Sequence, residues 1–185
     1  MKDQDDADPN RQVLHEGKAH WDVSDYGTLF VPPSDSASTI LSAMTKEERT
    51  NFNTLLASLQ TWHEGVSETP GLLFHPEARA CLWAAALAKI ADHFRLIRQD
   101  GRALFFIGAA WNISNYPVFA YNAALLSLNE GDAARAKNLL RSYLAEYQKV
   151  LKSATMILIN PEITEQELND LAESARARLI ALEGV

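Results

Sequence analysis

The stretch from Pro76 to Gln99 is the feature that most limits the fold of this chain. A helix drawn through these residues carries apolar or small side chains on nearly every face. The side chains in question are Cys81, Leu82, Trp83, Leu87, Ile90, Phe94 and Ile97, with alanines at 78, 80, 84, 85, 86, 88 and 91. A helix that is apolar all round is normally enclosed by other elements, and small residues allow those elements to approach closely. We therefore predict a central buried helix that begins at Pro76 or Glu77 and ends before Asp100.

Helical periodicity continues on both sides of this segment. Thr45 and Glu48 have the spacing of a capping box, and apolar residues then recur at three- and four-residue steps until Gly65. Thr164 and Glu167 have the same spacing before the last periodic segment. Helices are predicted from 45 to 65, 76 to 99, 103 to 112, 117 to 128, the turn at 130–132 to about 156, and 165 to 182. Because no stretch of convincing length alternates with a period of two, the predicted class is all-α, an antiparallel helical bundle.

The first 38 residues differ in composition from the rest of the chain. Asp3, Asp5, Asp6 and Asp8 make the start acidic, and Pro32-Pro33 forbids helix near its end. The length of 185 residues suits one domain of ordinary size. We predict a flexible acidic leader over 1–38 and a single all-helical domain over 39–185.

The charge balance excludes several classes of partner. The chain has 17 Lys and Arg against 24 Asp and Glu, which gives a formal net charge of −7. Such a chain is not drawn electrostatically to nucleic acid or to anionic membranes. The longest apolar run, Ala103 to Trp111, is much shorter than the roughly 20 residues of a spanning helix, and the first ten residues contain no secretory signal. We expect a cytoplasmic protein that neither binds nucleic acid nor inserts into a membrane.

One segment carries a recognisable motif. Tyr121-Asn-Ala-Ala124 precedes a turn at Glu130-Gly-Asp132, and Ala136 and Leu140 follow the turn. Small residues at 124 and 136 allow two antiparallel helices to cross closely, and Gly131 suits the turn between them. In these positions residues 117–150 resemble a tetratricopeptide repeat.

The resemblance has consequences for fold and function. It implies a tetratricopeptide-like α-α superhelix with a concave groove that holds an extended or helical peptide. A small, acidic, helical chain is also similar in outline to the bacterial chaperones that keep translocator proteins soluble before type III secretion. The resulting expectation is a non-enzymatic adaptor or chaperone that binds a protein segment.

Tyrosines of this hairpin are the predicted contact residues. Tyrosine combines an apolar ring with a polar end and is enriched in recognition surfaces. We predict that Tyr121, Asn122, Tyr143 and Tyr147 form the partner-binding inner face of the hairpin. An alternative, in which the aromatic residues of this region only pack the core, stays open.

Catalytic and metal-binding signals are weak. Cys81 is the only cysteine, so an intramolecular disulfide is impossible, and its apolar surroundings predict an inert thiol. None of the common nucleotide-binding or hydrolase motifs occurs in the sequence. The prediction is therefore no catalytic residue, no metal and no cofactor.

Two other function classes stay open beside the interaction module. One is a small helical metal-binding protein or enzyme that uses His75, Glu77 and His93. The other is a secreted effector or toxin-neutralising protein whose acidic surface meets a basic partner. Self-association into a homo-oligomer is a further open alternative.

Overall fold

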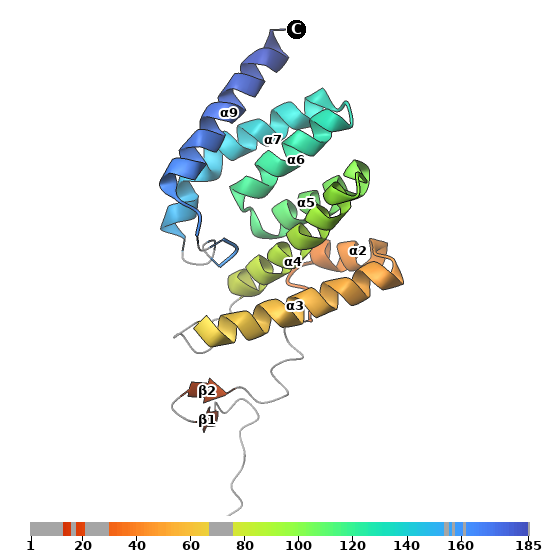
Figure 1. The fold of residues 1–185 in the computed structure, drawn as a ribbon, viewed down its shortest axis with the longest axis vertical. Helices are drawn as coiled ribbons and strands as arrows, with labels where there is room; N and C mark the ends of the chain where they lie inside the picture. Colours follow the sequence, from red (N-terminus) through yellow and green to blue (C-terminus); the bar gives the residue numbers. More distant parts are fainter. Residues whose placement is uncertain are drawn as a thin grey trace, which may run out of the picture.

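A computed structural model of the chain describes residues 13–15, 18–20, 30–66, 76–153, 156, 158–160 and 162–184. The body is built from helices (Figure 1). The helices are α2 (Asp35–Ala43), α3 (Lys46–Val66), α4 (Pro76–Leu96), α5 (Asp100–Ser114), α6 (Pro117–Asn129), α7 (Ala133–Glu146), the 3-10 helix η2 (Tyr147–Lys152) and α9 (Glu165–Glu183). The predicted all-α class is confirmed.

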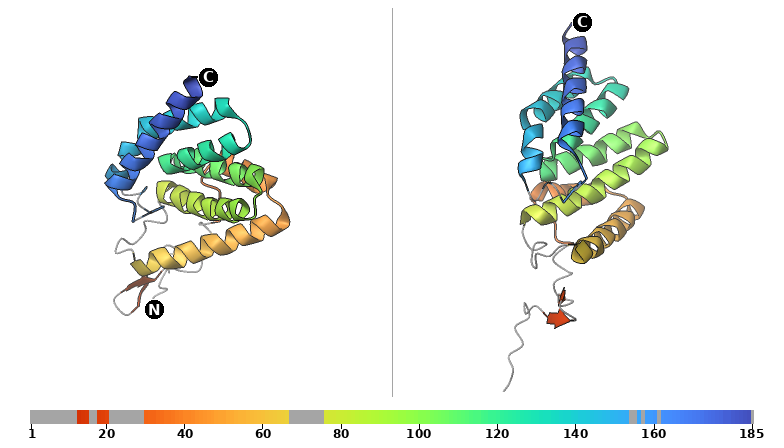
Figure 2. Two further views of the ribbon diagram at one scale, coloured as in Figure 1. Left: turned by 45° about the horizontal axis from the view of Figure 1, so that its top comes forward. Right: turned by 60° about the vertical axis from the view of Figure 1, so that its left-hand side comes forward.

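Successive helices pack on one another, so the chain forms a layered stack (Figure 1, Figure 2). From α4 to α9 each helix lies against the next: α4 on α5, α5 on α6, α6 on α7, and α7 on α9. At the other end of the stack, α3 packs against α4 and α2 against α5. This order places α9 as the last layer at one end.

The central helix is buried as its composition predicts. Ten residues of α4 are buried, among them Leu82, Trp83 and Leu87. The indole ring of Trp83 meets the ring of Phe52 from α3 edge-on, with centroids 4.9 Å apart. Edge-to-face packing of this kind stabilises aromatic pairs beyond the area they bury. The α3–α4 contact is thus a hydrophobic interface formed around these two rings.

Both predicted capping boxes are present. At α3 the amide of Thr45 donates to the Glu48 carboxylate at 2.8 Å, and the amide of Glu48 donates to the Thr45 hydroxyl at 3.2 Å. At α9 the amide of Thr164 donates to the Glu167 carboxylate at 2.8 Å, and the reciprocal bond is 3.2 Å long. Each box satisfies amides that the first turn of a helix leaves without partners.

Glu48 also anchors α3 to α5. The Arg102 guanidinium holds both carboxylate oxygens of Glu48, with a distance of 2.6 Å from Nε to Oε1. A further hydrogen bond of 3.3 Å runs from Arg102 to the carbonyl of Ala43 at the end of α2. The guanidinium carbon lies 4.5 Å from the ring centroid of Phe105 and 4.9 Å from that of Phe106. One arginine therefore joins α2, α3 and α5.

The segment before residue 45 contains more structure than the sequence predicts. Helix α2 crosses the predicted boundary at 38/39 and buries Ala37 and Ile40. Its cap is the hydroxyl of Ser34, which accepts the amide of Ala37 at 3.3 Å. The helix is short and follows two prolines, so its periodic signal is too brief to recognise. Residues 1–12, 16–17 and 21–29 of the predicted leader lie outside the described residues.

Two further differences concern chain segments of a few residues. Strands β1 (Val13–His15) and β2 (Lys18–His20) form an antiparallel pair that period-two alternation does not reveal, because three residues are too few. The long helix predicted after residue 132 ends as an α-helix at Glu146 and continues as η2 to Lys152. Among the described residues, no helix has both the length and the hydropathy that crossing a membrane requires.

Candidate functional site

The α6–α7 hairpin has the turn that its sequence predicts. Gly131 has a φ of +80°, a left-handed conformation that favours glycine. The Asp132 carboxylate then caps α7 by accepting the amide of Arg135 at 2.9 Å. Ala124 and Ala136 are fully buried, so the two helices approach closely at small residues.

The structure places the three predicted contact tyrosines in the core beside α9. Tyr121, Tyr143 and Tyr147 are 5%, 0% and 7% exposed, and their rings contact one another in series at 5.4 and 5.5 Å. The Tyr121 hydroxyl lies 2.8 Å from that of Ser174, and the Tyr143 hydroxyl donates to the carbonyl of Leu168 at 2.7 Å. The three rings therefore pack in the core against α9, and Tyr121 also lines a surface hollow beside that helix. That they contact a partner stays a prediction.

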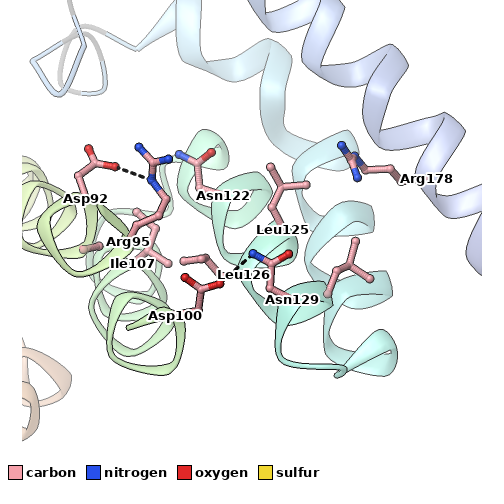
Figure 3. A pocket seen from close by; sticks show the side chains of 11 residues that line it. Asp92, Arg95, Asp100, Ile107, Asn122, Leu125, Leu126, Asn129 and Arg178 are labelled. Carbon is pink, nitrogen blue, oxygen red and sulfur yellow. Dashed lines mark hydrogen bonds and ion pairs between the residues drawn. The ribbon is translucent and has the colours of Figure 1, made fainter. Parts of the chain in front are cut away.

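Asn122 is the one predicted contact residue that is exposed. It lines a surface hollow of about 600 Å³ between α4, α5, α6 and α9 (Figure 3). The apolar lining includes Ile107, Leu125 and Leu126, and Arg178 points toward the hollow from α9 (Figure 3). The hairpin motif predicts this residue as a contact, but the hollow around it depends on helices distant in sequence.

Two more hollows adjoin the first. The second, of about 510 Å³, shares Asp92 and Asn122 with it, and the third, of about 450 Å³, shares Val118 and Asn160 with the second. The three hollows are thus linked in series by shared lining residues, and we name them together the α4–α6–α9 groove. Its lining residues used below are Lys89, Asp92, Arg95, Asp100, Val118, Phe119, Tyr121, Asn122, Leu125, Asn129, Ile159, Asn160, Glu162, Glu167, Asp170 and Arg178.

Polar groups are arranged unevenly along the groove. In the first hollow Arg95 pairs with Asp92 at 3.4 Å, and the Asn129 amide donates to Asp100 at 2.9 Å (Figure 3). Arg178 forms no ion pair with any of the described residues. This end of the groove therefore presents one guanidinium without an ion pair to a described residue and two carboxylates that already have partners.

The far end of the groove is acidic. Its third hollow contains Glu167 and Asp170 from the first turns of α9. Hydrogen bonds from Thr164 hold the pKa of Glu167 below its usual range, so this carboxylate stays ionised at neutral pH. Asp170 accepts a hydrogen bond of 2.7 Å from the side chain of Gln166, a neutral donor. Neither carboxylate forms an ion pair with a Lys, Arg or His among the residues that the structure describes.

Two of the three residues of the metal alternative lie far apart. His75 lies outside the described residues, whereas Glu77 and His93 are both on α4, separated along its axis by about 24 Å at 1.5 Å per residue. In the part of the chain that the structure describes, no group of three His, Cys, Asp or Glu side chains is arranged to hold a metal ion. One ion therefore cannot be shared by Glu77 and His93.

Cys81 is buried, as predicted. It lies on α4, and burial raises the pKa of its thiol to about 12. A thiol with this pKa is protonated at neutral pH and is a poor nucleophile.

Comparison of the chain with protein-family models, with curated proteins and with solved structures finds no match. The functional argument therefore depends on the chemistry of the groove.

Proposed function

We propose that this chain is a non-enzymatic protein-binding module that holds a segment of a partner protein in the α4–α6–α9 groove. The observation that carries the proposal is the series of three neighbouring hollows, each of which shares lining residues with the next: Asp92 and Asn122, then Val118 and Asn160. The tetratricopeptide-like interpretation of α6 and α7, and an adaptor or chaperone role in the cytoplasm, are parts of the same proposal.

The lining suits a peptide. Side chains of Val118, Phe119 and Leu125 offer apolar contact along the groove. Asn122 stands between the first two hollows, and its amide can both donate to and accept from a peptide main chain. Mixed apolar and polar linings of this kind are typical of recognition sites. A depression that crosses three helices also matches the length of an extended segment better than that of a small metabolite.

Site-specific photo-crosslinking tests the proposal. A photoreactive benzoylphenylalanine at Asn122 is expected to crosslink the full chain to a partner protein in extracts of the native host. The same residue at Thr54, on the exposed side of α3 and away from the groove, is the matched control. Crosslinks at 122 that are absent at 54 support the proposal.

A substitution in the lining of the groove shows whether the crosslinks depend on the groove. Leu125→Glu places a charge on the apolar lining and is expected to abolish the crosslinks at 122, while circular dichroism shows the helical content unchanged. Equal crosslinking at both positions, or crosslinks that persist in Leu125→Glu, would contradict binding in the groove.

A further inference from the structure

We infer that the segment bound in the α4–α6–α9 groove carries an apolar residue for the second hollow and basic residues over the third. This inference rests on the proposed function. It adds the chemistry of the bound segment and the end of the groove at which its basic residues lie. It depends on the distribution of charge between the two ends of the groove.

Charge becomes more negative from the first hollow to the third. In the first, two acidic residues face two basic ones, and the acidic residues already have partners in Arg95 and Asn129. In the second, Lys89 stands against Asp92 and Glu162. The lining of the third contains two carboxylates and no basic side chain. An occupant that spans the groove therefore meets a negative potential at one end only.

The carboxylates at the acidic end have no ion-pair partner among the described residues. Glu167 and Asp170 receive hydrogen bonds from neutral groups of Thr164 and Gln166, which orient a carboxylate without cancelling its charge. Glu162 has no ion pair with any residue described in the structure. Lysine or arginine of the occupant would supply the missing positive charges.

The second hollow supplies the apolar contact. Phe119, Val118 and Ile159 contribute apolar surface to its wall. An apolar side chain of the occupant that packs here would remove this surface from water.

Other occupants fit the charge pattern less well. An acidic segment would be repelled at the third hollow, and nucleic acid would be repelled by a chain with a net charge of −7. A segment with basic residues at both ends would meet Arg178 and Arg95 at the first hollow. A segment that is basic at one end is the match that complementarity favours.

Selection from a displayed library of random peptides on the full chain tests this inference. The expected result is enrichment of peptides in which lysine or arginine lies to one side of a large apolar residue. A selected peptide is then synthesised with a fluorescent label, and its dissociation constant is measured by anisotropy against several variants of the chain. The affinity for wild type is expected to fall as salt is added.

Charge-neutral substitutions locate the contact. The double variant Glu162→Gln, Asp170→Asn is expected to bind the peptide about fivefold more weakly or worse, since one ion pair in water changes affinity by about that factor. The control Glu47→Gln, Glu173→Gln makes the same change in net charge at exposed positions outside the groove and is expected to bind as wild type does.

The outcomes separate this inference from the proposed function. Peptides that lose binding in Leu125→Glu but show no basic preference would overturn the inference and leave the groove as a binding site. Equal effects of the groove and control double variants would also overturn it. If no peptide is selected, or none is sensitive to Leu125→Glu, both the inference and groove binding fail.

Discussion

The hydroxyl of Tyr143 on α7 donates a hydrogen bond of 2.7 Å to the carbonyl oxygen of Leu168 on α9. Both residues are at most 1% exposed, so the bond lies inside the interface between the hairpin and the last helix. Tyr143 therefore helps to hold α9 against α7. Substituting this tyrosine by alanine would test packing rather than recognition.

We expect Tyr143→Phe to destabilise the fold by about 1 kcal/mol, the usual net contribution of one hydrogen bond. The ring and its packing remain, so the change isolates the hydroxyl. Urea unfolding followed by circular dichroism measures the effect. Tyr147→Phe is the matched control, because among the described residues that hydroxyl has one long hydrogen bond, accepted from Gln148 at 3.3 Å. A smaller loss for Tyr143→Phe than for the control would show that the bond to Leu168 contributes nothing.

Tyr116→Phe should have the opposite sign. The Tyr116 hydroxyl is buried without a partner among the described residues, so removing it relieves a desolvation cost. We expect unchanged stability or a gain of about 1 kcal/mol in the same urea experiment. A loss of stability as large as that of Tyr143→Phe would mean that the hydroxyl has a partner in the folded chain.

These two tyrosines also predict how stability responds to alkali. Burial raises the pKa of Tyr116 and of Tyr143 above the ordinary value near 10. A raised pKa means that folding favours the protonated form, so the stabilising effect is complete below pH 10 and is lost as the pH rises further. Wild type should lose stability between pH 10 and pH 11, and the double variant Tyr116→Phe, Tyr143→Phe should lose less. Parallel curves for the two proteins would contradict burial of these hydroxyls.

The pair formed by Glu48 and Arg102 predicts a response to acid. Hydrogen bonds from Arg102 hold the pKa of Glu48 below the ordinary value of a glutamate, near 4.5. The stabilising effect is therefore present above pH 4.5 and is lost as the pH falls through the lowered pKa. We expect Glu48→Gln to be less stable than wild type at pH 7 and to lose less on acidification. Glu47→Gln, at the exposed neighbouring position, should follow the wild-type curve.

Local sequence patterns predicted much of the helical architecture for a physical reason. The burial of α4, the two capping boxes and the α6–α7 turn all depend on residues within a few positions of each other. Helix α2 is not predicted from the sequence, because only Ala37 and Ile40 of its nine residues are buried. Two apolar positions do not make a helical periodicity that can be distinguished from the pattern of a loop.

The site was less predictable because it depends on contacts between distant segments. The sequence of the hairpin predicts the importance of its tyrosines, but not that α9 covers them. Their partners Leu168 and Ser174 lie on α9, more than twenty residues away in the sequence. Nothing in the sequence marks Arg178 or Asp170 as a residue of a binding site, since both are exposed residues of an amphipathic helix. They become part of a groove only when α9 packs beside α6.

The turn between α6 and α7 requires a left-handed residue. Gly131→Ala should destabilise by about 1 kcal/mol through backbone strain alone, because a Cβ at this position meets nothing within 4 Å. Gly101→Ala is the control, since it lies in helix α5 and its Cβ would touch only the flexible end of Glu130. Alanine there should be neutral or stabilising. Thermal unfolding of both variants distinguishes strain at one turn from a general cost of adding a methyl group.

Truncation decides where the folded body begins. A chain that starts at residue 30 keeps α2, whereas one that starts at residue 45 loses the buried side chains of Ala37, Ile40 and Met44. Loss of this apolar burial against α5 should cost about 3 kcal/mol. Urea unfolding of the two truncated chains beside the full chain measures it. We expect the chain from 30 to match the full chain and the chain from 45 to unfold at lower urea. Equal midpoints for all three would mean that α2 adds nothing to stability, and the body would then begin after the predicted leader.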